Sequence, residues 1–524
     1  MIKPYLFFIC RENQRRHRIV SADSADTVAE RCCKKQRDEM CGRETDMNMG
    51  GSRGAVISTS AAENMERFHK ILRVDKNFDV VYRSMKIGGR QACFYFIDGF
   101  VKDEVLQRII QFLCDLGEEN FPKEAHEFSK KCLPYGEIGI LREEGEIVTQ
   151  ILMGITCFFI DGYDAALTID CRHYPTRSVE EPGKEKVLRG SRDGFVETLI
   201  FNTAMIRRRI RNPELTVEIT QAGKSSRTDI AICYMESRVD KELLNKIKTR
   251  IENIQVDALT MNQESLAECI YPYKWYNPFP KFKYSERPDT AAAQLLEGNL
   301  VILVDTSPAA MILPSSVFDI IEEADDFYFP PLTGTYLRLS RVTIALLGVI
   351  VTPIWLLLMQ NPRWIPESLR FIVIQDAVNI PLIWQLLILE FSIDGLRLAA
   401  LNTPSMLTTP LSVIAALVVG EFAANSGWFN SETMLYMAFV ALSNYTQSSF
   451  ELGYALKFMR LQLLILTALF NLWGFVAGMT VFVLAIVTNK TIAGKSYIYP
   501  ILPFSLKEFK RRFFRTRLRP EEKQ

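Results

Sequence analysis

The sequence is poor in the residues that build metal and catalytic centres. It has four histidines, scattered along the chain, and 11 cysteines that form no Cys-x-x-Cys pair. A zinc site needs several ligands at short, paired spacing, so this pattern predicts none. The His-Glu-x-x-His and Gly-x-Gly-x-x-Gly fingerprints of zinc proteases and dinucleotide sites are also missing. The sequence therefore predicts no enzyme and no cofactor.

The chain has almost no net charge, but its charges are unevenly distributed. Lys and Arg number 62 against 61 Asp and Glu, a formal net charge of +1, which argues against a general nucleic-acid binder. Residues 342–487 hold only 12 charged side chains in 146 positions, about 8%, whereas the rest of the chain has about 29%. This separation predicts a soluble α/β part joined to an α-helical, polytopic membrane part.

The soluble part is expected in a reducing compartment. All 11 cysteines precede Tyr271, and they are odd in number and without a disulfide pattern. The first apolar run, Tyr5 to Cys10, is shorter than a secretory signal requires and is followed rather than preceded by arginines. We therefore predict no signal peptide.

Composition and periodicity divide the chain into six segments. Residues 1–63 are polar and without periodicity, which predicts disorder or an extension from a mis-assigned start codon. Strand patterns around a Gly-Gly turn, followed by a helical pattern from Asp103, indicate a mixed α/β subdomain. A β-β-α-β order, with strands expected at 215–219, 228–235 and 254–256, indicates a second one. The predicted segments are the extension 1–63, the subdomains 64–194 and 195–270, a linker and pre-membrane segment 271–337, a membrane domain 338–490, and a basic tail 491–524.

The membrane domain contains five hydrophobic elements. The tail after Ser505 carries seven cations up to Arg519, and such a juxtamembrane cluster normally stays cytosolic. With both flanks cytosolic, the number of crossings must be even, so one element does not cross. We expect this to be the second, which is interrupted by Asp376 and Pro381. The last is long enough for one tilted span. The elements are 342–359, 371–391, 411–424, 433–450 and 461–487.

Polar residues within these elements are candidates for an ion path. Glu390, Asp394 and Arg397 lie at i, i+4 and i+7, so they share one helical face. Charges there are costly, which favours a function, while a structural Asp394–Arg397 pair at a helix end is the alternative. Asn444 and Gln447 form a further polar patch, for which hydrogen bonding between helices is the simpler interpretation.

A second membrane candidate is a stripe of small residues. Ala416, Gly420 and Ala424 recur every four positions, a spacing that permits close helix packing. The same helix could line a pore in an oligomer, with Glu421 near its mouth.

The soluble part contains an arginine-rich loop, 189–194. Its arginines and glycine-freed amides could bind an anion, whereas a salt-bridged turn is the structural alternative. The following segment, 195–211, is predicted to be a helix in which three arginines near the end suit the helix dipole. Pro213 ends it.

Several runs of residues together form a distinctive pattern. They contain Arg189, Gly190, Arg192 and Asp193; Arg207, Arg208, Arg209 and Pro213; Asn277 to Pro280; Glu286, Arg287 and Asp289; and Leu295 to Gly298 with Val304 to Pro308. These runs resemble the GerA family of spore germination proteins, over about residues 64–505. The Gly-Ser-Arg-Asp-Gly form of the arginine loop favours a sporulation subfamily over the nutrient-receptor A subunits, where Pro-Arg-Glu-Gly is commoner.

The resemblance implies a function that the composition does not. It implies a multi-pass protein of the inner spore membrane, with the soluble region facing the cytosol or spore core. It further implies a homo-oligomer that contacts membrane lipids and other germination membrane proteins, and a channel-like role in ion release. A non-conducting scaffold, a nutrient-sensing receptor A subunit and a coupled transporter are the alternatives.

Overall fold

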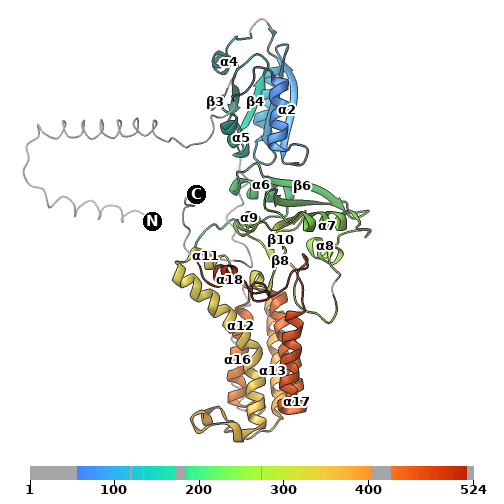
Figure 1. Ribbon diagram of the computed structural model, residues 1–524, viewed down its shortest axis with the longest axis vertical. Helices are drawn as coiled ribbons and strands as arrows, with labels where there is room; N and C mark the ends of the chain where they lie inside the picture. The colour runs from blue at the N-terminus through green and yellow to red at the C-terminus, as the bar shows by residue number, and fades with distance from the viewer. Residues whose placement is uncertain are drawn as a thin grey trace, which may run out of the picture. The chain divides into compact units, whose positions relative to one another are not determined.

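The structure is a computed structural model that describes residues 56–118, 121–133, 135–172, 185, 187–272, 274–402 and 426–515. The chain divides into two units, Met1–Val56 and Ile57–Gln524, and the fold below is that of the second (Figure 1). Its strands are β1 Val80–Ile87, β2 Arg90–Ile97, β3 Ile138–Leu141, β4 Thr156–Ile160, β5 Ala166–Ile169, β6 Leu215–Ala222, β7 Thr228–Met235, β8 Lys283–Ser285, β9 Leu300–Val304 and β10 Ala310–Leu313.

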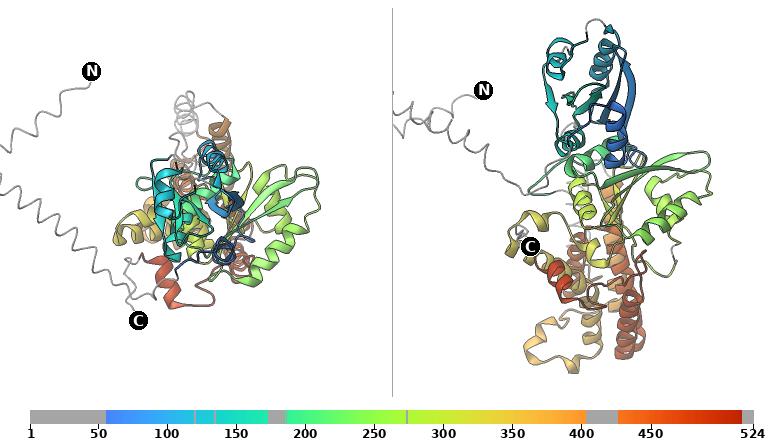
Figure 2. Two further views of the ribbon diagram at one scale, coloured as in Figure 1. Left: turned by 90° about the horizontal axis from the view of Figure 1, so that it is seen from above. Right: turned by 45° about the horizontal axis from the view of Figure 1, so that its top comes forward.

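The helices alternate with these strands and then dominate the second half of the chain (Figure 2). They are α2 Ala61–Leu72, α3 Asp103–Cys114, α4 Ala125–Lys131, α5 Glu144–Leu152, α6 Leu199–Arg209, α7 Lys241–Glu252, α8 Asn262–Ile270, α9 Pro288–Leu296, α10 Val317–Ile321, α11 Asp325–Tyr328, α12 Pro331–Gln360, η3 Pro362–Trp364, η4 Glu367–Ile372, α13 Leu382–Asn402, α16 Ser431–Tyr445, α17 Phe450–Val487 and α18 Leu506–Phe513.

The first sheet has the antiparallel order β1-β2-β4-β5-β3. The predicted hairpin is confirmed, since β1 and β2 pair up to Ile87 and Arg90, and Gly88 and Gly89 make the turn with positive φ. Side chains alternate across a strand, so each face of the sheet packs on its own helices. On β2, Tyr95 belongs to the core with α2 and α5, and Phe94 to the core with α3 and α4.

The beginning of this subdomain corrects the predicted extension. Ile57 is buried in the first core, and the Ser60 side chain caps α2 by accepting from the Glu63 backbone N–H. Residues 57–63 therefore belong to the fold. The predicted disorder of residues 1–55 lies outside the described residues.

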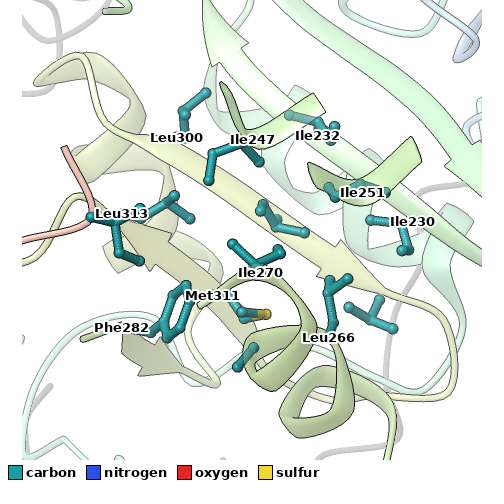
Figure 3. Packing of buried hydrophobic residues seen from close by; sticks show 14 of the residues in the cluster. Ile230, Ile232, Ile247, Ile251, Leu266, Ile270, Phe282, Leu300, Met311 and Leu313 are labelled. Carbon is teal, nitrogen blue, oxygen red and sulfur yellow. The ribbon is translucent and has the colours of Figure 1, made fainter. Parts of the chain in front are cut away.

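The second sheet has the antiparallel order β6-β7-β9-β10-β8. One face packs on α7 and α8, where Ile247 and Ile270 meet Ile232 and Leu300 of the sheet (Figure 3). The other face packs on α6 and α9. Three strands of this sheet come from the predicted linker, so the boundary at residue 270 must be corrected to lie after Leu313. The strand predicted at 254–256 is absent from the described residues; β9 occupies the place beside β7.

Among the described residues, two helices are long and apolar enough to cross a membrane, α12 and α17. α17 is interrupted at Asn471, whose φ of 51° and ψ of −130° are not helical. Residues 463 and 478 would lie about 22 Å apart in a straight helix, yet a Cβ added to Gly478 would lie 3.3 Å from the Leu463 Cα. The chain therefore folds back at Asn471 into two antiparallel halves, 450–470 and 472–487, and the prediction of one tilted span over 461–487 is wrong.

The second hydrophobic element is interrupted as predicted. The short 3-10 helix η4 ends at Ile372, residues 373–381 are not helical, and the regular helix α13 begins at Leu382, directly after Pro381. α13 continues past Glu390 and Asp394 to Asn402, so these charges lie within the helix rather than near its end. The fourth element ends earlier than predicted, at Tyr445 of α16.

Candidate functional site

The candidate site is a cluster of four charged side chains between α13 and the first half of α17. α13 contributes Glu390 and Asp394, four positions apart, and α17 contributes Lys457 and Arg460, three positions apart. Both spacings place the two side chains on one helical face. The two faces meet with opposite charge, so the cluster is formally neutral. We call these four residues the charge cluster.

Arg460 and Glu390 form the closed centre of the charge cluster. Arg460 Nε donates to Glu390 Oε1 at 2.5 Å, and Nη2 donates to Oε2 at 3.0 Å. The side chains are 1% and 2% exposed. Arg460 Nη1 also donates to the Gly348 carbonyl oxygen of α12 at 2.9 Å. This planar, two-bonded arrangement is the geometry for which arginine is suited and lysine is not.

Lys457 connects this centre to Asp394. Its Nζ lies 3.6 Å from Glu390 Oε2, donates to the Glu390 carbonyl oxygen at 3.2 Å, and contacts Asp394 Oδ2 directly. The Lys457 side chain is 6% exposed, whereas that of Asp394 is 26% exposed. The charge cluster is therefore sealed at Arg460 and opens towards the surface of the bundle at Asp394.

Arg397 does not take part in the charge cluster. Its guanidinium lies over the rings of Tyr445, Phe450 and Tyr454, with Cζ 5.6, 4.6 and 5.4 Å from the ring centroids. This is a cation–π arrangement. The expected Asp394–Arg397 pair is wrong, because Asp394 pairs with Lys457 on another helix.

α12 and α16 pack closely against each other at Gly348, the residue of α12 that Arg460 contacts. A Cβ at Gly348 would lie 2.1 Å from the Ser443 Oγ of α16, and that hydroxyl donates to the Ile344 carbonyl oxygen at 2.9 Å. Only glycine permits this approach. The Gly348 carbonyl oxygen also accepts from Arg460, so this residue of α12 contacts both α16 and the charge cluster.

The other predicted membrane residues lie apart from the charge cluster or outside the described residues. Asn444 is half-buried near the end of α16. Gln447 follows that helix; its Nε2 donates to Thr446 Oγ1 at 3.4 Å, and its Oε1 is buried without a hydrogen bond in the described residues. The predicted small-residue helix with Ala416, Gly420, Glu421 and Ala424 lies outside the described residues.

Lys457 and Arg460 were missed as members of the site. The sequence does carry a signal for them, since they are the only cations between Arg397 and Asn489. One apolar segment has two acids at i, i+4 and another has two bases at i, i+3. The two pairs are equal in number and opposite in charge, and each pair lies on one face of its helix. Because a membrane interior penalises unpaired charge, such a match predicts a contact between the segments.

The arginine loop 189–194 is a salt-bridged turn. Arg209 Nη2 donates to Asp193 Oδ1 and Oδ2 at 2.7 and 2.5 Å. Arg287 bonds both carboxylate oxygens of Asp289 at 3.1 and 2.6 Å, and its Nη2 also donates to the Ser191 carbonyl oxygen at 2.8 Å. Burial opposes ionisation of both acids. Hydrogen bonds from their arginines, from Ser191 to Asp193 and from Tyr328 to Asp289, together with the arginine charges, outweigh it and lower the pKa of each acid.

The remaining residues of the loop pack on a neighbouring segment or face outwards. A Cβ at Gly190, whose φ is positive, would lie 2.3 Å from the Tyr328 ring, and the Tyr328 hydroxyl donates to Asp289. Arg189 lies over the Phe329 ring with Cζ 5.9 Å from its centroid. Arg192 and Arg208 are exposed, and the Glu286 carbonyl oxygen accepts from the Phe195 backbone N–H at 2.8 Å.

A buried ion pair joins the two sheets. Arg207 of α6 donates from Nε and Nη2 to the two carboxylate oxygens of Asp79 at 2.8 and 3.1 Å, and from Nη1 to the Leu215 carbonyl oxygen. The two side chains are 0% and 2% exposed. Of the three consecutive arginines, the first therefore joins the subdomains and the third fixes the arginine loop.

A second group of paired charges surrounds the beginning of α12. Arg338 Nη2 lies 2.7 Å from Glu322, and Arg341 lies 2.7 Å from Glu323 and 2.8 Å from Asp326. Burial raises the pKa of Glu322 and Glu323, although the arginines oppose this. We call these five residues the pre-membrane collar. It fixes the first membrane helix to the segment that leaves the second sheet.

The C-terminal helix α18 completes the pre-membrane collar. Arg512 contacts Asp319 and lies 3.5 Å from Glu322, and its carbonyl oxygen accepts from Arg338 at 3.0 Å. A cavity of about 20 Å³ lies among these side chains, enough for a single water molecule. At least one cation of the predicted basic tail is thus neutralised by protein carboxylates. Within the described residues, no group of three or more His, Cys, Asp or Glu side chains could hold a metal ion.

Comparison with known proteins identifies relatives along nearly the whole chain. A family model described as Bacillus/Clostridium GerA spore germination protein matches residues 66–524. The chain is 36% identical over 450 residues to stage V sporulation protein AF of Bacillus subtilis (strain 168), covering 86% of this chain and 91% of that protein. It is 26% identical over 480 residues to spore germination protein KA of the same organism, covering 90% and 87%.

A solved structure is also similar. It is the N-terminal domain of the A subunit of the Bacillus megaterium spore germinant receptor GerK3, with a TM-score of 0.38 and 22% identity, covering 50% of this chain and 97% of that chain. The family match begins inside α2 and includes both sheets and the membrane helices. The resemblance inferred from the sequence motifs is confirmed: the chain belongs to the GerA family of spore germination proteins.

Proposed function

We propose that the chain is a channel-like subunit of a membrane oligomer that promotes ion release during spore germination. The observation that carries this proposal is the charge cluster. Anchoring a soluble domain in a membrane requires only apolar helices. Four charges inside the helices cost free energy, so their presence favours a function beyond anchoring. The family membership supplies the context of germination, and α12 and the first half of α17 supply helices of membrane-spanning length.

The geometry favours Asp394 over Glu390 as the group that an ion meets. Both carboxylate oxygens of Glu390 are held by Arg460, and that pair is almost completely enclosed. Asp394 is held by Lys457 through Oδ2 and remains 26% exposed. We therefore assign Asp394 to the ion path and the Arg460–Glu390 pair to its support.

Two isosteric substitutions test this assignment. In Asp394→Asn the side chain keeps its shape and loses its charge, so assembly should be retained and ion efflux from reconstituted vesicles should slow. Glu390→Gln should instead lower the amount of folded protein, because it leaves two cations with one acid. Normal efflux in Asp394→Asn at wild-type protein level would remove Asp394 from the path and leave the helix 411–424 as the better candidate.

The main alternative is a scaffold that organises germinant receptors without conducting. The observation favouring it is that every member of the charge cluster has a partner inside the same chain. Purified protein in vesicles distinguishes the two proposals, because a scaffold gives no efflux under any gradient. Efflux that depends on a counter-gradient would indicate a coupled transporter, and efflux that depends on an added nutrient a receptor A subunit.

We further propose that the protein lies in the inner spore membrane with its two sheets facing the cytosol or spore core. Its partners would be membrane lipids, further copies of itself and other germination membrane proteins. Spore-membrane fractionation, together with cross-linking of the intact complex, tests this location and these partners.

A further inference from the structure

The loop between α8 and β8 exposes two aromatic side chains for which the proposed function has no role. The Trp275 side chain is 96% exposed and that of Tyr276 is 62% exposed. Their rings lie edge to face with centroids 6.0 Å apart, and Lys274 Nζ lies 5.8 Å from the Tyr276 ring. A tryptophan that is so exposed within its own chain leaves one of the largest apolar side chains unburied.

Polar contacts fix this loop to the end of α17. Asn277 Nδ2 donates to Asn489 Oδ1 at 3.1 Å. Lys281 Nζ contacts the same Asn489 oxygen and donates to the Lys490 carbonyl oxygen at 2.7 Å. Asn489 is the second residue after Val487, where α17 ends. The loop is therefore held beside the last membrane helix at its point of exit.

Aromatic contacts at the base of the loop strengthen this attachment. The Tyr497 hydroxyl donates to the Pro280 carbonyl oxygen at 2.8 Å, and the Tyr497 and Phe279 rings have centroids 6.1 Å apart. Tyr497 and Phe279 are both buried. The base of the loop is thus packed, whereas the segment 274–276 projects from it.

Distances along the chain keep Trp275 close to the end of α17. Two residues span at most about 7 Å, so Trp275 lies within that distance of Asn277, which in turn bonds Asn489. The headgroup layer on each side of a bilayer is about 5–8 Å thick. Trp, Tyr and Lys are the residues enriched at this boundary, because their apolar parts meet acyl chains while their polar ends stay hydrated.

We propose that residues 274–276 form a second membrane contact of the soluble part, separate from the spanning helices. The rings of Trp275 and Tyr276 lie in the headgroup layer of the leaflet at which α17 ends, and Lys274 faces the lipid phosphates. The contact holds the second sheet against the membrane surface. It requires that the second half of α17 crosses the membrane, but it does not depend on ion conduction.

Fluorescence quenching of the full chain in lipid vesicles tests the proposal. The chain has six tryptophans, so the emission of Trp275 is obtained as the difference between the wild type and Trp275→Phe. In vesicles of phosphatidylethanolamine and phosphatidylglycerol doped with lipid brominated near the headgroup end of the acyl chain, this difference emission should lose more than half its intensity. Aqueous iodide should quench it less in vesicles than in detergent.

A matched control uses the first sheet. Phe112 on α3 is 42% exposed, and Phe112→Trp in the Trp275→Phe background places a tryptophan on a surface without a membrane contact. Its emission should be quenched by iodide and not by brominated lipid. The proposal is overturned if Trp275 behaves like this control. It is equally overturned if quenching by brominated lipid disappears as more protein is packed per vesicle, since the loop would then contact a second copy of the chain.

Discussion

Removing Arg460 should lower the free energy of unfolding of the membrane helices far more than removing an exposed arginine does. Arg460→Met keeps the apolar stem and deletes the charge, which leaves Glu390 with only Lys457 at 3.6 Å, shared with Asp394. The charge cluster then has a net charge of −1 inside the bundle. The double variant Glu390→Met with Arg460→Met removes both charges and leaves the Asp394–Lys457 pair, so the charge cluster is neutral again.

The expected magnitudes follow from the enclosure of this pair. Breaking a buried pair by removing one partner costs about 3–5 kcal/mol, whereas replacing both partners with apolar side chains is about neutral. A loss of about 3 kcal/mol already lowers the ratio of folded to unfolded protein about a hundredfold. The double variant should therefore be more stable than either single variant. As a control, Arg370→Met removes an arginine that is 74% exposed and 3.7 Å from Glu367, and it should cost about 0–1 kcal/mol.

The assay is unfolding of the purified full chain in mixed micelles of rising SDS content, followed by the loss of helical circular dichroism. Comparing the wild type, both single variants and the double variant gives the coupling energy of Arg460 and Glu390 directly. If the two losses simply add, or if Arg460→Met costs no more than Arg370→Met, the two charges do not depend on each other. The assignment of the pair to the support of the ion path would then be refuted.

Four further predictions follow from other parts of the molecule. Burial, and to a smaller extent the charge of Lys274, lowers the pKa of Lys281 from 10.5 to about 8. Because the unfolded chain then binds more protons between these values, the free energy of unfolding should rise with pH across this window, and Lys281→Met should abolish the rise in a denaturant titration. Arg207→Met should cost about 3–5 kcal/mol by leaving Asp79 buried and unpaired, against about 0–1 kcal/mol for Arg142→Met, whose pair with Asp164 is more than 60% exposed on both sides, both measured by thermal unfolding. Deletion of residues 1–55 should leave membrane insertion and germination unchanged, whereas a deletion that extends through Ile57 should lower the thermal midpoint, because Ile57 is part of a core. In a chain without the four cysteines of that extension, an impermeant maleimide should label Cys114, the one exposed cysteine of the described residues, only after the membrane is opened. Cys93, whose pKa burial raises to about 11, should stay unlabelled.

Much of the soluble fold could be predicted because its signals are local. The Gly88-Gly89 turn requires positive φ at both positions, and Asp240 caps α7 through its side chain as its position before an amphipathic run predicts. What failed was the assignment of β9 and β10 to the second sheet. β9 pairs with β7 and β10 pairs with β8, and each partner lies far from it in sequence. No periodicity within 300–313 indicates which strand each will pair with.

The membrane part was predicted less well because its charges were judged one helix at a time. Glu390 and Asp394 in an apolar segment read as a helix end, since an unpaired charge is unstable at mid-membrane. The helix continues past them because Lys457 and Arg460, more than 60 residues later, supply the opposite charges. The reversal at Asn471 was not predicted either, because its neighbours in the sequence give no signal for a turn. The surrounding residues are uniformly apolar, and only the backbone of Asn471, with its amide paired to that of Asn361, marks the turn.

The reversal at Asn471 supports the proposal that both flanks of the membrane domain lie on one side. α12 begins at the pre-membrane collar and ends at Asn361, whose side-chain amide donates to Asn471 Oδ1 at 2.6 Å. From Asn471 the chain returns along the second half of α17 to Asn489, which contacts Lys281 of the soluble part. The first and last helices of the membrane domain thus have their outer ends together at the soluble part and their far ends together at the Asn361–Asn471 contact. A single straight helix over 461–487 would have placed its two ends at opposite levels of the bundle, and the tail could then reach the pre-membrane collar only by crossing again.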